Sequence, residues 1–257
     1  MWDAGDYEQI GSRIQDLSVR LVDTVEHRMG GLSGLSVLDL ACGTGNASLE
    51  ASRRGAQVLG TDLAEGLLRH AADKAHAERL SVRWQMADAA DTGLAAGEFD
   101  VVMSSVGLVM VTEQAKAVAE LARVVRPGGL VAWTAWCKRP DNPFRAPLND
   151  FIPPPDPGTP AVDDWADVEK VTGWLREAFS GITVETWDFW WRFPDVQAAM
   201  RLVLEESPMH LASWQEVQVH DRPALRRAFE AEFESHRTSD GTVAFSNPYV
   251  VVAATRD

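Results

Sequence analysis

The sequence predicts an α/β fold: a Rossmann-like, doubly wound sheet of seven strands, mostly parallel, with an N-terminal helix and a cap after the fifth strand. Two patterns predict it. Short apolar runs typical of buried strands alternate with segments whose apolar residues recur at helical spacing. A glycine-rich turn follows the first run, and an acidic residue ends the second. The length, 257 residues, suits one such domain with an elaboration.

Each element follows from its local pattern. A first helix is expected over residues 7–28, where apolar residues keep helical spacing until a glycine cluster. The predicted strands are 36–40, 57–61, 81–86, 99–104, 130–136 and 182–193, with a last strand pair at 242–246 and 249–254. The other predicted helices are 47–54, 66–77, 114–125, 167–179, one after Pro194, and 223–236. This alternation predicts parallel strands joined by right-handed crossovers.

The composition changes after the fifth predicted strand. Residues 138–160 hold many of the prolines, including three in a row at 153–155, which exclude regular helix and central strand. Three segments are therefore expected. They are an N-terminal helix with the Rossmann-like core (1–137), a cap (138–181), and the remainder of the same domain with a helical, substrate-side insert (182–257).

Charge and cysteine content exclude several classes of function. The net charge of −14 disfavours nucleic acid and anionic membranes as partners. No apolar run approaches the roughly 18 residues that span a bilayer, and the N-terminus lacks a signal-peptide pattern. Cys42 and Cys137 are expected to be thiols in a reducing cytoplasm. No spacing of Cys and His suggests a metal site.

The segment Val37–Asn46 carries the strongest functional signal; it reads VLDLACGTGN. Glycine at 43 and 45 permits tight turn angles and close approach of a ligand to the backbone. Asp62, at the end of the next strand, is placed to accept hydrogen bonds from ribose hydroxyls. A dinucleotide-binding fingerprint is the alternative, but it would put Ser48 where a third glycine or alanine is needed.

The stretch Asp39–Gly45 resembles the nucleoside-binding motif of the class I S-adenosylmethionine-dependent methyltransferases, Asp/Glu-x-Gly/Ala-x-Gly-x-Gly, with Ala41 in place of the first glycine. The Pro127–Gly129 turn before the fifth strand is also frequent in that family. The resemblance covers roughly residues 34–136. It implies S-adenosylmethionine as cofactor. The segment Ser104–Gly107 does not resemble the Asn/Asp-Pro-Pro-Tyr of enzymes that methylate planar nitrogens.

The resemblance also implies a set of cofactor-binding residues on the loops that follow the strands. They are Tyr7, Asp39, Ala41, Cys42, Gly43, Gly45, Asn46, Asp62, Leu63, Asp88, Ala89, Ser104 and Ser105.

Three carboxylates of this set have alternative roles. Asp39 would orient the turn or the amino group of the cofactor, or it caps local backbone amides. Asp62 would bind ribose, or it caps the following helix. Asp88 would contact the adenine amino group, or it is a solvated loop residue whose role Asp91 takes. Leu63 would pack on adenine, and Tyr7 would help to cover the cofactor.

The acceptor is expected to be a small organic molecule, hydrophobic or aromatic, because many of the ten tryptophans fall in the later part of the chain. His210, in the later insert, is the candidate catalytic base. The predicted activity is methyl transfer that releases S-adenosylhomocysteine, by a monomer or homodimer. A nicotinamide-dependent oxidoreductase and a non-catalytic cofactor-binding module are the alternatives.

Overall fold

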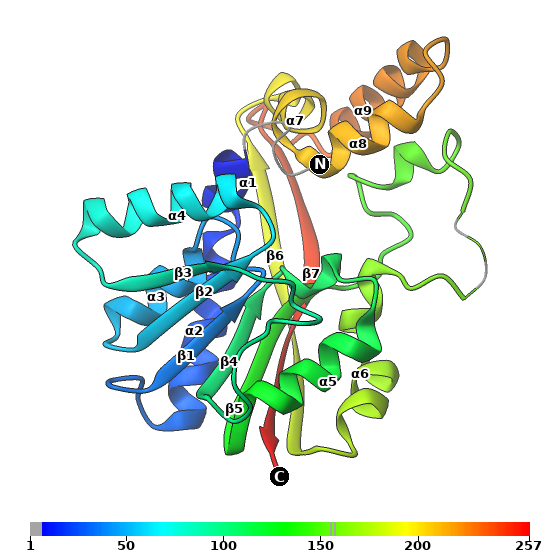
Figure 1. The fold of residues 1–257 in the computed structure, drawn as a ribbon. Coiled ribbons are helices and arrows are strands. Elements are labelled where there is room, and N and C mark those ends of the chain that lie inside the picture. The colour runs from blue at the N-terminus through cyan, green and yellow to red at the C-terminus, as the bar shows by residue number, and fades with distance from the viewer. Residues whose placement is uncertain (1–6, 155, 157) are drawn as a thin grey trace. The chain divides into compact units, whose positions relative to one another are not determined.

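A computed structural model of the chain describes residues 7–154, 156 and 158–257, and its sheet has seven strands (Figure 1). The order is β3-β2-β1-β4-β5-β7-β6. The first five strands pair in parallel, and β7 runs antiparallel to β5. The strands are β1 (Ser36–Leu40), β2 (Gln57–Asp62), β3 (Val82–Met86), β4 (Phe99–Ser105), β5 (Val125–Trp136), β6 (Phe179–Phe193) and β7 (Val243–Arg256). The predicted fold class is confirmed.

Helices follow most of the strands. The α-helices are α1 (Tyr7–Arg13), α2 (Gln15–Met29), α3 (Asn46–Arg53), α4 (Glu65–Glu78), α5 (Gln114–Val124), α6 (Val168–Leu175), α7 (Val196–Arg201), α8 (Pro208–Glu216) and α9 (Arg222–Ser235). Short 3₁₀-helices lie at Leu108–Met110, Ala146–Leu148 and Val162–Ala166, and a π-helical turn at Leu202–Glu206.

The chain divides into two compact units. The core unit comprises Gly11–Cys137, Pro160–Trp187 and Tyr249–Asp257. The aromatic unit comprises Met1–Ile10, Lys138–Thr159 and Asp188–Pro248. Strands β6 and β7 contribute residues to both. The three-segment division expected from the sequence stays a prediction.

Alternation along β1 assigns its two faces in the core unit. Leu38 and Leu40 join the buried cluster that includes Leu121 of α5 and Leu175 of α6. Asp39 points to the opposite face and meets Ser48 of α3. Such period-two alternation is expected for a sheet covered by helices on both faces. Asp39 is therefore buried at the end of a central strand, with an exposed fraction of 1%.

Three elements differ from the prediction. The helix expected over residues 7–28 breaks at Ile14, which has φ −102° and ψ 15°. The expected turn at Pro127–Gly129 is a bulge in β5: the register with β4 jumps from Phe99–Val125 to Val101–Leu130. The expected last strand pair is one continuous strand, β7. Its Pro248 is tolerated because β5 ends at Trp136, opposite Tyr249.

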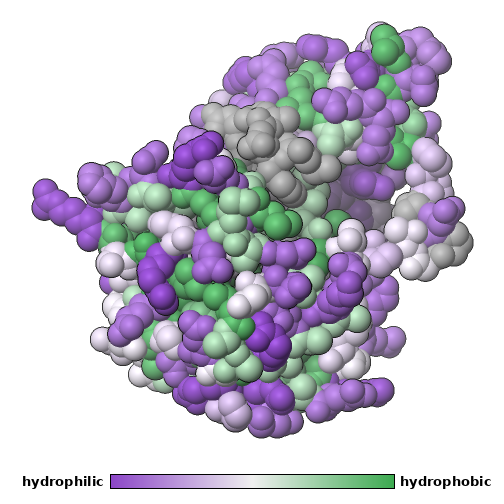
Figure 2. All heavy atoms as spheres, in the orientation of Figure 1, coloured by the Kyte–Doolittle hydropathy of each residue, from purple (hydrophilic) through white to green (hydrophobic). Residues whose placement is uncertain are grey.

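In the described part of the chain, no helix combines the length and apolar character needed to cross a membrane. Figure 2 shows hydrophilic residues spread widely over the face that it draws.

Candidate cofactor-binding site

The turn after β1 is held in a left-handed conformation at three positions. The φ angles are +50° at Ala41, +54° at Gly43 and +80° at Gly45, the residue before α3. The Cys42 N–H donates to Thr61 O (2.9 Å), which fixes the turn against β2. Left-handed angles cost a residue with a Cβ about 1 kcal/mol or more. A glycine at the position of Ala41 would avoid this cost.

Gly45 is required by packing as well as by its φ angle. A Cβ there would lie 2.6 Å from the Trp84 ring and 3.0 Å from Ala71 Cβ. Gly60 of β2 meets the same ring, because its Cβ would lie 2.4 Å from Trp84. Trp84 therefore fills the space between the start of α3 and the sheet. The alternating pattern of its strand does not predict this packing role.

Asp62 ties the glycine turn to the end of β2. Its Oδ2 accepts from the Gly43 N–H (2.8 Å), and its Oδ1 accepts from the Ala64 N–H (2.9 Å) ahead of α4. The alternative role of Asp62 as the cap of the following helix is not what the structure shows, because Ala64 is the N-cap residue of α4 and the helix has no side-chain cap. The Asp62 side chain instead holds the glycine turn through the Gly43 N–H. Each carboxylate oxygen has further lone pairs. Leu63 beside it is 63% exposed, as an apolar surface for a planar ring requires.

Asp39 is the most unusual carboxylate of the site. Its Oδ2 accepts a 2.6 Å hydrogen bond from Ser48 Oγ, whereas its buried Oδ1 has no hydrogen-bond partner among the described residues. Burial raises the pKa of Asp39 to about 7, although hydrogen bonds from Ser48 oppose the shift. An oxygen left unpaired in this way costs about 1–3 kcal/mol. A cationic ligand with N–H donors would relieve that cost.

Strand β4 ends beside β1 in a second strained turn. Val106 has φ +58°, which is rare for a β-branched residue. Gly107 follows, and a Cβ there would lie 2.2 Å from Ala41 O, so glycine relieves crowding at this point. Ser104 donates to Leu40 O (2.7 Å) and accepts from the Leu108 N–H (3.1 Å). The Ser104 hydroxyl therefore joins the ends of β1 and β4.

Ser105 belongs to a row of hydroxyl groups. Its Oγ accepts from Ser18 Oγ of α2 at 2.9 Å and lies 3.5 Å from Thr134 Oγ1 of β5. Ser18 and Thr134 are buried, whereas Ser105 is partly exposed. Ser105 is thus the member of the row that can meet a ligand.

After β3, Asp88 is exposed and its Oδ1 accepts from the Ala90 N–H (2.8 Å). Ala89 is buried in the core cluster, which leaves only its backbone for a ligand. Asp91 bridges to Asp88 through the backbone. The choice between Asp88 and Asp91 as the adenine contact stays open.

Three further predicted cofactor-binding residues have different surroundings. Asn46 makes two hydrogen bonds within the protein, to Gly11 and Lys74. Cys42 is partly buried in the glycine turn, and burial raises the pKa of its thiol. The Tyr7 side chain lies outside the described part of the structure.

His210 lies in the aromatic unit. Its Nδ1 is 2.7 Å from Ser207 Oγ, and its ring packs edge-on against Phe144 at 5.3 Å. Loss of hydration lowers the pKa of His210 to about 4, although a hydrogen bond with the Phe144 backbone acts in the opposite direction. The imidazole is therefore neutral near pH 7. A neutral imidazole can accept a proton, but its low pKa makes it a weak base.

Comparison with known proteins agrees with this arrangement. Residues 37–129 match a family model described as a methyltransferase domain. A malonyl-[acyl-carrier protein] O-methyltransferase of Salmonella typhimurium is 31% identical over 235 residues, covering 87% of this chain and 83% of the relative. An uncharacterized protein of Mycobacterium tuberculosis is 36% identical over 187 residues, or 71% of this chain. The chain spans 66% of the length of that mycobacterial relative.

The fold is shared with solved structures of low sequence identity. The YcgJ protein of Bacillus subtilis superimposes with a TM-score of 0.62 at 14% identity, over 93% of this chain and 97% of that one.

The glycine turn, the carboxylates at the ends of β1 and β2 and the strand order together define a class I methyltransferase core. The chain belongs to the class I S-adenosylmethionine-dependent methyltransferases. The cofactor of this family is S-adenosylmethionine, as predicted from the glycine turn and Asp62, and the family assignment decides against a nicotinamide-dependent oxidoreductase.

Proposed function

We propose that this protein transfers a methyl group from S-adenosylmethionine to a small organic acceptor with an apolar or aromatic body and releases S-adenosylhomocysteine. One observation carries the proposal. Asp39 is next to last in β1, Asp62 is the last residue of the adjacent β2, and the buried Oδ1 of Asp39 has no partner among the described residues. A ligand that combines an ammonium group with ribose hydroxyls matches both carboxylates.

Different residues of the core unit would bind the ribose, the ammonium group and the adenine ring of the cofactor. Asp62 would accept from ribose hydroxyls through lone pairs not used by Gly43 and Ala64. Asp39 would accept from the ammonium group, directly or through water, and Leu63 would cover the adenine ring. When bound, the cofactor supplies an electrophilic methyl carbon attached to a positively charged sulfur. The chain contributes orientation and exclusion of water, which can provide much of the acceleration.

Several observations bear on the proposed class of acceptor. A net charge of −14 disfavours polyanionic acceptors. The Salmonella relative is named as an O-methyltransferase, which makes oxygen the first acceptor atom to test. Trp133 and Trp165 give little support to an aromatic acceptor pocket, because their rings pack on each other in the core with centroids 5.7 Å apart. Trp187 and Trp190 are exposed and stay candidates.

His210 is the proposed base for acceptors that lose a proton during transfer. Its neutral imidazole supports this role, and its hydrogen bonds with Ser207 and the Phe144 backbone favour a relay through the Ser207 hydroxyl. We also propose that the protein is a monomer or homodimer and that it is cytoplasmic. The two cysteine thiols support the cytoplasmic location.

Calorimetric titration with S-adenosylhomocysteine tests cofactor binding. Wild type should bind saturably, and Asp62→Ala should bind about 100-fold more weakly, because a charged acceptor and the support of the Gly43 N–H are lost together. Asp150→Asn, an exposed loop carboxylate, is the control and should bind as wild type. Binding of NADH in place of the homocysteine ligand would contradict the proposal.

A second assay tests turnover. The protein is incubated with S-adenosylmethionine and a panel of small carboxylates, phenols and amines, and release of S-adenosylhomocysteine is measured. Acceptor-dependent release supports the enzyme. Binding without release for any acceptor would favour a non-catalytic module.

A further inference from the structure

Helix α1 is attached to the glycine turn at Gly11. The Gly11 carbonyl accepts a 2.7 Å hydrogen bond from Asn46 Nδ2, and Asn46 is the first residue of α3. A Cβ on Gly11 would lie 3.1 Å from Thr44 Oγ1, and both Gly11 and Thr44 are buried. The α1 backbone at Gly11 thus packs closely against the turn, where a Cβ would require the Thr44 side chain to shift by a few tenths of an ångström.

The break at Ile14 makes this contact possible. Helix α1 ends at Arg13, so the Gly11 carbonyl belongs to the last turn, whose carbonyl groups lack partners within the helix. Asn46 supplies a donor to one of them. The polar group that the break leaves unpaired is thereby satisfied by a residue of the cofactor turn.

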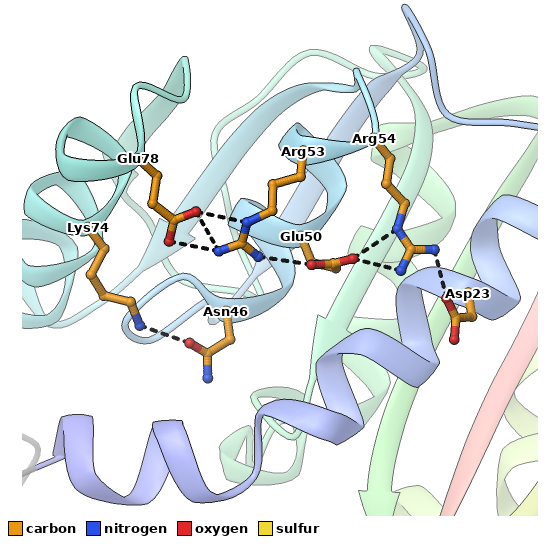
Figure 3. A network of polar contacts seen from close by, with 7 residues as sticks. All are labelled: Asp23, Asn46, Glu50, Arg53, Arg54, Lys74 and Glu78. Atoms are coloured by element: carbon orange, nitrogen blue, oxygen red, sulfur yellow. Dashed lines mark hydrogen bonds and ion pairs between the residues drawn. The ribbon is translucent and has the colours of Figure 1, made fainter.

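The orientation of the Asn46 amide is fixed from its other side. Lys74 of α4 donates from Nζ to Asn46 Oδ1 at 2.9 Å (Figure 3). The amide oxygen therefore faces Lys74, and the nitrogen faces Gly11. A positive charge near the C-terminal end of α1 is also favourable.

The helix that carries Asn46 is braced on both sides (Figure 3). Arg54, the residue that follows α3, pairs with Asp23 of α2 at 2.7 Å and with Glu50 of α3 at 2.7 Å. Arg53 pairs with Glu78 of α4 at 2.6 Å. Exposed pairs of this kind contribute modestly one by one, but a network that joins three helices restricts their relative motion. Asn46 is thus presented from a braced position.

We propose that Asn46 is a positioning residue that couples ligand binding at the Gly43–Gly45 turn to the stability of α1. In this role Asn46 acts through Gly11 and does not itself hold the cofactor. A ligand that orders the turn would strengthen the Asn46–Gly11 contact, and a well-held α1 would favour the ligand-competent turn. The inference rests on the proposed function to the extent that S-adenosylhomocysteine is the ligand.

The test compares hydrogen–deuterium exchange of residues 7–13 with and without saturating S-adenosylhomocysteine, together with calorimetric affinity. Asn46→Asp keeps an oxygen for Lys74 and places a favourable acid at the start of α3, so the fold is retained. It removes the donor to Gly11. We expect ligand-induced protection of α1 in wild type, loss of that protection in Asn46→Asp, and about 5- to 20-fold weaker binding.

Two further variants locate the effect. Lys74→Met removes the partner of the amide oxygen but leaves the bond to Gly11, so α1 should still be protected by the ligand. Asn149→Asp makes the same chemical change at an exposed position and should match wild type.

The outcomes separate three cases. Weaker binding by Asn46→Asp with α1 still protected would mean that Asn46 contacts the ligand directly, and this would overturn the inference. Wild-type affinity and protection in that variant would overturn it as well. If wild-type protein bound no S-adenosylhomocysteine, the proposed function would fall together with this inference.

Discussion

Asp39 in the core unit is buried and His210 in the aromatic unit is half-buried, and loss of hydration moves their pKa values in opposite directions. The pKa of Asp39 rises to about 7 and that of His210 falls to about 4, so burial favours the neutral form of each. Their hydrogen bonding differs. His210 bonds to Ser207 and to the Phe144 backbone, whereas Asp39 keeps a buried oxygen with no partner in the described part of the chain.

Packing and backbone strain also differ between the surroundings of Asp39 and of His210. In the aromatic unit the ring of Phe144 packs edge-on against the rings of Trp191, Phe245 and His210, with centroid distances of 4.9–5.3 Å. In the core unit, left-handed angles at Ala41 and Val106 and an unpaired carboxylate oxygen gather where β1 and β4 end. Strain and unused hydrogen-bonding capacity of this kind mark functional sites.

The largest expected change in the free energy of unfolding comes from a substitution in the aromatic unit. Phe144→Ala should lower the free energy of unfolding by about 3–5 kcal/mol, because it opens a cavity at the centre of five rings. Urea unfolding measures the loss, and Phe144→Leu should cost less because it keeps more volume. A loss below about 1 kcal/mol would show that the cluster is loosely packed.

Gly107→Ala tests crowding in the core unit. Its Cβ would lie 2.2 Å from Ala41 O, a backbone atom that moves only with the glycine turn. We expect about 1–3 kcal/mol of destabilisation. Binding of S-adenosylhomocysteine should weaken in parallel. Gly173→Ala, where the added Cβ meets nothing within 4 Å, is the control and should not destabilise. Unchanged ligand affinity in Gly107→Ala would separate the β4 turn from the site.

The pH dependence of stability should differ between the two groups. Asp39 has a raised pKa, so folding is favoured at low pH and loses stability as pH rises from about 4 to about 7. His210 has a lowered pKa, so stability is lost as pH falls from 6.5 to about 4. Each group has a limiting slope of about 1.4 kcal/mol per pH unit.

Between pH 5 and 6.5 the two slopes have opposite signs, so a variant that removes one titrating group should show the slope of the other. Over that interval Asp39→Asn should become more stable as pH rises. His210→Gln should become less stable as pH rises from 5 to 7. Urea unfolding at several pH values provides the measurement. Identical pH profiles for wild type and both variants would show that neither group is buried as described.

The smallest effect should come from Ser207→Ala. It removes one hydrogen bond to His210 Nδ1 and should cost about 1 kcal/mol in the free energy of unfolding. If His210 is the base and acts through the hydroxyl, the pH profile of turnover should also shift, whereas affinity for S-adenosylhomocysteine should not. A turnover profile identical to that of wild type would remove Ser207 from any relay.

Local sequence patterns are sufficient for the first four strands and for the identity of the glycine turn, but not for the bulge in β5 or the continuity of β7. Residues 36–40 were predicted as a strand and form β1, because apolar alternation and the following glycines act over a few residues. Asp62 was identified from its place at the end of the next strand, and its bond to the Gly43 N–H agrees with a role at the turn.

Contacts between distant residues decided the rest. The break at Ile14 interrupts an apolar pattern that continues through it, and the bond that satisfies the broken end comes from Asn46, 35 residues away from Gly11. The bulge at Pro127–Gly129 depends on the register with β4.

The order and type of the main elements follow from the amino-acid sequence, because helix and strand periodicity and turn chemistry are local properties. The pairing of polar groups depends on the folded chain: Asn46 bonds to Gly11 and Lys74, Ser104 to Leu40, and Asp39 to Ser48 alone. The physical reason is that hydrogen-bond partners and burial, which set both pKa values and strain, depend on segments that meet only after the chain folds.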